Sequence, residues 1–584
     1  MKFEDLANEL FLDIFELLDG VDLLHAFHNL NYRVNRLLLI HFRFYHLDFR
    51  SLSKNRFDII TENYLRLISD KILSIHLSND DETPDLPYLF VSRGYTLNKF
   101  INLQSLSLYY IDCFDILNEI IVQCNHLTSL TDLKLIKCYF NSEENDFHCL
   151  INNIWNLPKL RKCLLDQINS RKIRLNELSM MSSSIEELSL ERMICSLKDL
   201  SNLFEHSPCL GRLTVNSISC SKFEQLEIVI RSLTSLKTFF DSSIDSMISL
   251  FKKLPNLSHL TLETVKINCN GCQWKQILVN YLGNLKVFRL KMNLNFSPHR
   301  NIEKQVNELI DSFRSSFWIE EHQWFVRCDW NPFNITNHAI LYTLPYRFDK
   351  CFNFDSIFTK STSPNDKHYW SYDRVQTLSY ENSENDLSKD SILFSARFPN
   401  LHHLKMSFPF QLDFNSCISS LNRLISLNAT LRHTDSTFIQ LQDLFYRSIH
   451  LYSFRLSYIK HIPMELFRMK SRSIHRLDFL TKFKSNIRYF NNEECLTLIN
   501  SSLGRQCQVL LIGIENRTSI IDLINQLFNL RSLICQCKDD KSIHSKSSSS
   551  SNDELIQWLS NNFPSTYFIS RDIKRTSFIR IWIG

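Results

Sequence analysis

A short pattern, Leu-x-x-Leu-x-Leu, recurs along this chain and constrains its fold more than any other feature. With Ile, Val, Met, Phe or Ala in place of some leucines, it occupies residues 103–108, 130–135, 185–190, 210–215, 257–262, 285–290, 401–406, 424–429, 451–456 and 474–479. In the first half of the chain successive copies lie roughly 21 to 31 residues apart, a spacing typical of repeat architectures. Such a repeat predicts a framework for binding, because its apolar residues build a core and supply no catalytic group.

The segments between the copies carry apolar residues at helical spacing. Examples lie at 114–121, 197–204 and 223–233. Several of these segments end in a proline just before the next copy, as at Pro158 and Pro255, and proline cannot continue a helix. Each unit therefore predicts a short strand, a turn and a helix, with parallel strands stacked along a solenoid and helices on its outer side.

This repeat resembles the leucine-rich-repeat class in an irregular form. The asparagine expected shortly after each strand is mostly replaced by apolar residues, as at Ile111, Met193 and Ile218. The resemblance implies an α/β fold. The fold class we expect is a three-helix N-terminal module followed by an irregular leucine-rich-repeat-like solenoid of parallel strands and outer helices.

Residues 3 to about 40 do not follow the repeat. Leu6, Leu10, Ile14 and Leu17 form a helical stripe, with further apolar residues beside it. Residues 19 and 20 are Asp-Gly, which predicts a turn, and Asp22 is a candidate cap for a second helix. A third short apolar face runs from 34 to 40. Three such short helices have little core of their own, so they need a neighbouring surface.

The segment from Leu6 to Leu24 resembles an F-box, on its Leu-Ala-Asn-Glu-Leu start, its Ile14-Phe15 pair and its Asp-Leu-Leu at 22–24. Ala7 stands where the family usually has proline, and Val34 where it has tryptophan. The resemblance implies docking to the Skp-type adaptor of a cullin–RING ubiquitin ligase. The adaptor-binding residues that it implies are Leu6, Leu10, Phe11, Ile14, Phe15, Leu18, Leu23, Leu24 and Val34. The alternative is that these residues only fill an internal three-helix core.

We divide the chain into four parts: the F-box-like module at 1–42, a first repeat block at 43–290, an irregular tryptophan-rich segment at 291–373, and a second repeat block at 374–584. In the irregular segment we expect strands at 317–318, 324–326 and 339–342. Its tryptophans, among them Trp318 and Trp370, fill a core or form a ligand-facing patch. A mobile serine-rich loop is expected near 545–551, and a last strand at 578–583 is expected to close the solenoid.

The sequence contains no motif for catalysis, and we do not expect an enzyme, a cofactor or a metal site. The pair Cys269 and Cys272 lacks a second pair at the spacing that zinc requires. Only 8 glycines occur in 584 residues, which argues against phosphate-binding loops. A net charge of +4, from 66 basic and 62 acidic residues, gives no reason to expect nucleic acid as a partner.

The absence of a secretory leader and of a long apolar run, together with 17 scattered cysteines, predicts an intracellular protein, cytoplasmic or nuclear, without a membrane span. We expect a substrate-recognition subunit of a cullin–RING ligase, which holds a target protein on its solenoid. The alternative is a scaffold with a degenerate F-box and no ligase role. Candidate target-binding residues lie between the inward leucines; they are Tyr109, Lys134, Lys137, Glu191, Arg192, Asn216 and Glu263.

Overall fold

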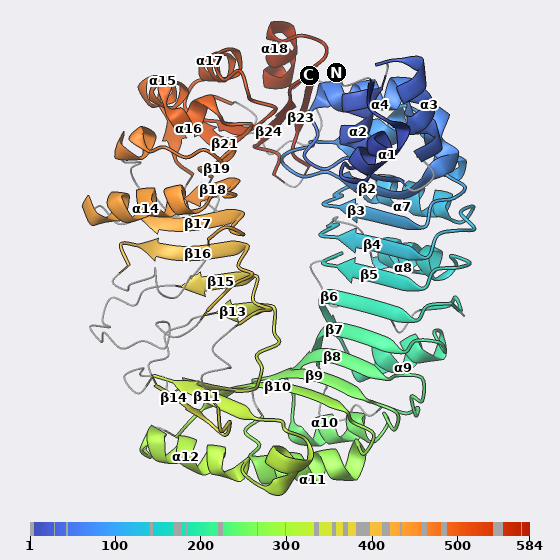
Figure 1. Ribbon diagram of the computed structural model, residues 1–584, viewed down its shortest axis with the longest axis vertical. Coiled ribbons are helices and arrows are strands. Elements are labelled where there is room, and N and C mark those ends of the chain that lie inside the picture. The colour runs from blue at the N-terminus through green and yellow to red at the C-terminus, as the bar shows by residue number, and fades with distance from the viewer. Residues whose placement is uncertain are drawn as a thin grey trace.

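The computed structural model is a mixed α/β structure in which two large sheets are lined by helices on their outer side (Figure 1). It describes residues 5–28, 30–41, 45–139, 144–168, 175, 178–182, 184–219, 226–265, 267–297, 299–331, 338–352, 358–365, 372–380, 397–410, 421–431, 435–456, 464–480, 487–540, 553–573 and 575–584. The predicted serine-rich loop at 545–551 and Trp370 lie outside these residues.

The first sheet holds 13 strands among the described residues. Its parallel part follows the chain in order: β1 (Tyr45–Asp48), β2 (Ile72–Ser78), β3 (Ser105–Tyr109), β4 (Asp132–Ile136), β5 (Lys162–Asp166), β6 (Glu187–Cys195), β7 (Arg212–Ile218), β8 (Ser235–Phe240), β9 (His259–Thr264) and β10 (Val287–Asn295). The antiparallel strands β12 (His338–Thr343), β11 (Val326–Trp330) and β14 (Phe358–Ser361) then extend it. The strands predicted from the repeat are confirmed here.

The second sheet holds 11 strands among the described residues. They are β13 (Lys350–Phe352), β15 (Thr377–Tyr380), β16 (His403–Phe408), β17 (Ser426–Leu431), β18 (Ser453–Leu456), β19 (Arg476–Asp478), β20 (Tyr489–Phe490), β21 (Val509–Ile514), β22 (Ser532–Cys537), β23 (Phe568–Arg571) and β24 (Ile579–Trp582). All pairs up to β22 are parallel. The predicted last strand is confirmed as β24, which pairs antiparallel with β22.

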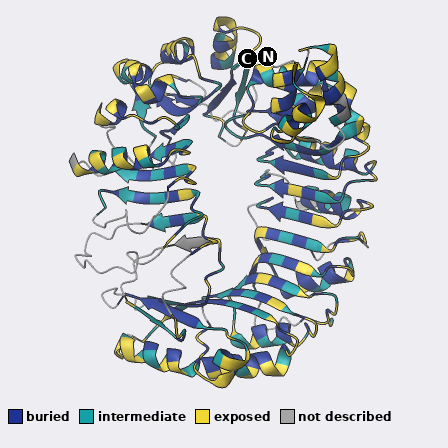
Figure 2. Cartoon of the chain, viewed as in Figure 1, coloured by how far each residue is buried: buried dark blue, intermediate teal, exposed yellow. Residues whose placement is uncertain are grey.

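Equivalent positions of the repeat face each other across neighbouring strands, which explains why the pattern recurs. Leu106 pairs with Leu133, and Leu188 pairs with Leu213. These leucines are buried, whereas the residues between them alternate to the other face, as the period of a strand requires. Figure 2 shows the result as buried bands crossing both sheets.

The helices of the structure are α1 (Asn8–Glu16), α2 (Gly20–Phe27), α3 (Tyr32–His41), α4 (Lys54–Asn63), α5 (Leu65–Ile68), α6 (Leu86–Ser92), α7 (Phe114–Cys124), α8 (Glu144–Trp155), α9 (Leu197–Glu205), α10 (Ile244–Phe251), α11 (Gly271–Tyr281), α12 (Ile302–Ser312), α14 (Asp435–Arg447), α15 (Asn492–Asn500), α16 (Ser502–Arg505), α17 (Thr518–Gln526) and α18 (Glu554–Asn562). Side chains start several of them. Ser196 and Asp199 form a capping box at α9, and Asn270 and Gln273 form another at α11.

Two local predictions are wrong. The expected helix at 223–233 is absent from its described part, 226–233, which is irregular although Leu226, Ile230 and Leu233 are buried. Ile228, Val229 and Ile230 are β-branched in succession, which disfavours a helix. The expected strand at 317–318 is instead a π-helical turn, Phe317–Glu321. Of the described tryptophans of this segment, Trp318 and Trp330 are buried in the core, and Trp324 is partly buried against it.

The two sheets curve toward each other so that the two ends of the chain lie side by side (Figure 1). Trp582 of β24 is fully buried; its indole Nε1 donates to the Leu52 carbonyl at 3.2 Å, and its ring lies 5.6 Å from that of Phe57. At the opposite end, Lys237 of β8 forms an ion pair with Asp349, which precedes β13. The described part of the chain thus forms a closed ring.

Candidate functional site

The helix α1 has two apolar sides. On one, Phe11 and Phe15 are fully buried, and the Phe15 ring lies 5.0 Å from that of Phe27 on α2. On the other, Leu10 and Leu17 are 49% and 84% exposed, and Ile14 between them is partly buried. The spacing of these three residues, i, i+4 and i+7, places them along one stripe of the helix. Single exposed leucines are common on protein surfaces, but an aligned set is not. The stripe is therefore a candidate surface for contact with a partner.

The turn from α1 to α2 and the packing of α3 hold this stripe in place. The Asp19 carboxylate caps α2, where it accepts from the Val21 and Asp22 amides at 2.8 Å. Arg33 of α3 donates to the Leu6 carbonyl at 2.6 Å and to Asn8 Oδ1 at 2.8 Å. The start of α1 is therefore fixed to α3 by hydrogen bonds.

The candidate adaptor-binding residues divide by exposure. Leu10 is exposed, and Leu6, Ile14 and Leu18 are partly buried. The other five are buried inside the module: Phe11, Phe15, Leu23, Leu24 and Val34. A partner therefore has direct access to the first four only. Leu17, the most exposed leucine of the stripe, was not among the nine predicted adaptor-binding residues. Its helical spacing from Leu10 was the signal that could have identified it.

The candidate target-binding residues are scattered, and several are already occupied. The Arg192 guanidinium forms an ion pair with Asp166, Glu263 forms one with Lys291 at 3.2 Å, and Lys137 donates to the Tyr110 hydroxyl at 2.7 Å. Tyr109 lies under Arg50, with 4.8 Å from the guanidinium carbon to the ring centroid. Lys134, Glu191 and Asn216 are exposed. The structure therefore does not bring the seven into one site.

A repeated turn follows the early strands and arranges their carboxyl ends. Tyr110, Lys137 and Gln167 each follow a strand and have positive φ, and each donates its amide to a carbonyl of the next strand, at 2.7 to 3.0 Å. Non-glycine residues adopt this left-handed conformation rarely, so its recurrence identifies a structural element of the repeat. It lines up the side chains of these residues along one edge of the first sheet.

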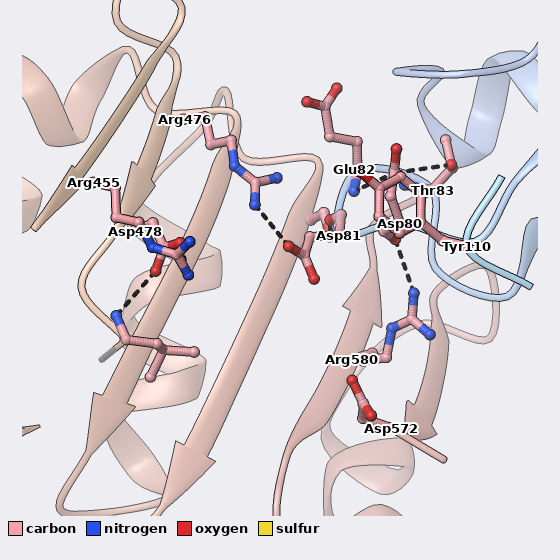
Figure 3. A network of polar contacts seen from close by, with 12 residues as sticks. Asp80, Asp81, Glu82, Thr83, Tyr110, Arg455, Arg476, Asp478, Asp572 and Arg580 are labelled. Carbon is pink, nitrogen blue, oxygen red and sulfur yellow. Dashed lines mark hydrogen bonds and ion pairs between the residues drawn. The ribbon is translucent and has the colours of Figure 1, made fainter. Parts of the chain in front are cut away.

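That edge meets the second sheet at a cavity of about 510 Å³. The first sheet contributes residues 79–82, Tyr110 and Asp112, and the second contributes the starts of β16 to β19 together with Arg575 and Arg580. Figure 3 shows this region, with Arg476 directed at Asp81 from a separate strand. The cavity lies where the ring closes, so both ends of the chain form its wall.

Polar contacts close the ring beside this cavity. Arg476 lies 2.6 Å from the Asp81 carboxylate, and Arg580 donates to the carbonyls of Asn79 and Asp80 at 3.2 and 2.8 Å. Ser532 donates to the Asp81 carbonyl at 2.6 Å. The Arg476 guanidinium lowers the pKa of Asp81 in spite of the burial that opposes it. Sequence reasoning missed these residues because Arg476 occupies a variable position of its repeat copy and nothing in the sequence links it to Asp81.

Burial acts differently on Asp478, which lies next to Arg476. Desolvation raises the pKa of its carboxyl group above the usual value, although Arg455 lies 2.8 Å away. Burial also lowers the pKa of His403, which lies at the start of β16, and the nearby His402 and Lys137 lower this pKa further. The closure therefore places two ion pairs, Arg476 with Asp81 and Arg455 with Asp478, close to groups whose pKa burial shifts.

The described residues include no group of three or more His, Cys, Asp and Glu side chains that could hold a metal ion. Cys269 is buried and Cys272 is exposed, so the pair does not share one environment. None of the helices in the described ranges has the length and apolar character needed to cross a membrane. A scan against models of protein families and a search of curated proteins found no match to this chain.

Proposed function

We propose that this chain is the substrate-recognition subunit of a cullin–RING ubiquitin ligase, with an F-box at its N-terminus and a leucine-rich-repeat-like solenoid behind it. The single observation that carries the proposal is the apolar stripe along α1 and its C-terminal cap, where Leu10 and Leu17 are exposed and Ile14 is partly buried. It lies on the module whose sequence resembles an F-box, and exposure of apolar surface is unfavourable unless a partner covers it. The partner would be the Skp-type adaptor.

The remainder of the chain suits a role in holding a target. Its long row of parallel strands presents a large polar surface built on a continuous core, and such a surface recognises proteins without catalytic groups. The contribution to ubiquitin transfer would be proximity, because two partners held on one scaffold meet at a high effective concentration. The cytoplasm or nucleus, where such ligases act, is the proposed compartment.

The alternative function is a protein-interaction scaffold that has lost the ligase role. One observation favours it: Phe11, Phe15, Leu23, Leu24 and Val34 are all buried within the module, so more than half of the implied adaptor contacts are internal. Under this alternative the N-terminal helices serve mainly to cover β1, on which α2 packs.

Capture of the full chain by purified Skp-type adaptor separates the two functions. We expect wild-type protein to bind and a Leu10→Asp/Leu17→Asp double variant to lose at least tenfold in affinity, since charge placed in an apolar contact is desolvated without a partner. A matched control is Leu67→Asp, which alters a leucine on α5 that is 66% exposed. Absence of wild-type binding at micromolar concentration would leave the scaffold function, and loss of binding in the control would refute the stripe as the contact.

A further inference from the structure

A group of cationic side chains lies where β8 and β10 meet the segment between β12 and β15. We call it the basic cluster, and it consists of Lys237, Arg289, Arg347 and Arg374. Arg289 is on β10, and Lys237 is on β8 at the same level of the sheet, since both pair with Thr261 of the strand between them. Their side chains leave the face opposite to the buried Phe288 and Leu290, as the alternation of a strand requires.

The connecting segment brings Arg347 to the same place. Tyr346 and Phe348 are buried, and the Lys291 ammonium of β10 lies 5.6 Å from the Phe348 ring. Arg347 is half-buried and Asp349 is exposed, whereas the two rings are buried. Asp349 forms an ion pair with Lys237 at 2.9 Å, which fixes the segment against β8.

The arginines of the cluster have no partner of their own among the described residues. No hydrogen bond or ion pair reaches the side chains of Arg289, Arg347 or Arg374 in that part of the chain. Elsewhere along the strands arginines are paired: Arg192 with Asp166, Arg455 with Asp478, and Arg476 with Asp81. Among the described residues, the arginines of the cluster therefore lack the carboxylate partner that these strand arginines have.

The arginines also repel one another. Burial and the positive charges of Arg374 and Arg347 lower the pKa of Arg289, and only Asp349 opposes them. That carboxylate is already bonded to Lys237. Like charges held together without counter-charge cost free energy, and an anion that binds between them recovers it. Guanidinium groups suit carboxylates in particular, because their fork of donors matches the two oxygens.

We propose that the basic cluster is the docking point for an acidic peptide segment of the target protein, one rich in aspartate and glutamate. A chain segment fits better than a small anion, because the four side chains come from separate elements and are spread over the sheet surface, with Lys237 and Arg289 two strands apart. This inference rests on the proposed function, since it names the kind of target that the solenoid would hold.

Fluorescence anisotropy with the full chain and a labelled peptide of alternating glutamate and glycine tests the proposal. We expect an Arg289→Gln/Arg374→Gln double variant to bind about tenfold more weakly than wild type. The matched control is Arg161→Gln/Arg212→Gln, which removes the same charge from arginines that are paired with Glu186 and Glu187. It should bind as wild type does. Binding should also weaken with added salt, since exposed charges are screened.

Three outcomes would overturn the proposal: no binding of the acidic peptide by wild type, equal losses in both double variants, or preferential binding of a single-stranded RNA of equal charge. Misfolding does not confuse the result, because removal of repelling charges is expected to leave the melting temperature unchanged or to raise it. A failure of the proposed ligase function would be detected in a different experiment, the capture of the chain by the adaptor. That experiment uses variants of the apolar stripe and does not include the acidic peptide.

Discussion

The Arg476 guanidinium lies 2.6 Å from the Asp81 carboxylate, an ion pair that spans 395 residues of the sequence. Both side chains are largely buried, with 18% and 27% of their surfaces exposed. Arg476 begins β19, and Asp81 follows β2, so the pair joins the second sheet to the first. It is a direct link across the closure of the ring, where Arg580 and Ser532 add hydrogen bonds to the neighbouring backbone.

We predict that Asp81→Asn lowers the free energy of unfolding by about 1–3 kcal/mol, because it leaves Arg476 charged and poorly paired in a buried place. A double-mutant cycle with Arg476→Met should give a coupling of about 1–2 kcal/mol. Urea denaturation provides both values. The exposed pair Arg161 and Glu186 is the matched control, with an expected coupling below about 1 kcal/mol. Equal couplings for the two pairs would mean that the ring closure does not depend on this contact.

The same pair predicts how stability depends on pH. Arg476 holds the pKa of Asp81 below its usual 3.8 in the folded chain. A carboxyl with a lowered folded pKa stabilises the protein above its unfolded pKa, and this contribution disappears as the pH falls through the folded value. The difference in melting temperature between wild type and Asp81→Asn should therefore be constant from pH 7 to about pH 5 and shrink below about pH 4. A difference that grows on acidification would contradict this assignment.

Because α11 packs closely on α12, we predict that a methyl group added at Gly271 destabilises the fold. A Cβ added at Gly271 would lie 2.4 Å from the Ser312 carbonyl oxygen at the end of α12. Since backbone must move to admit it, we expect Gly271→Ala to cost about 1–3 kcal/mol. Gly283→Ala is the control, because nothing lies within 4 Å of its added Cβ. It should be neutral or stabilise slightly, by reducing the entropy of the unfolded chain. Thermal melts of the two variants distinguish these results.

The strands and many helices could be predicted from the sequence. Each has one buried face, so its apolar residues recur at the spacing typical of a strand or of a helix. Leu106 and Leu133 face each other for this reason. It did not allow prediction of the closure, since Asp81 and Arg476 carry no local signal and meet only through the summed curvature of two sheets. The irregular stretch at 226–233 was wrongly predicted as helical, because buried residues at helical spacing also occur in an irregular segment packed on a core. The basic cluster escaped notice because its members come from separate segments.

The pair Cys269 and Cys272 gives a last prediction, on thiol chemistry. Cys269 is buried, and desolvation raises its pKa to about 11, whereas Cys272 is exposed on α11. The thiolate is the reactive form, so the native chain should alkylate at Cys272 and leave Cys269 unmodified. Cys124, whose pKa burial raises to about 12, should be protected as well, and the exposed Cys149 and Cys209 should react. Mass spectrometry after brief iodoacetamide treatment, with a urea-unfolded sample as control, measures each site. Equal modification of Cys269 and Cys272, or a disulfide between them, would show that the two thiols share an accessible site and that the Cys-x-x-Cys spacing has a chemical role.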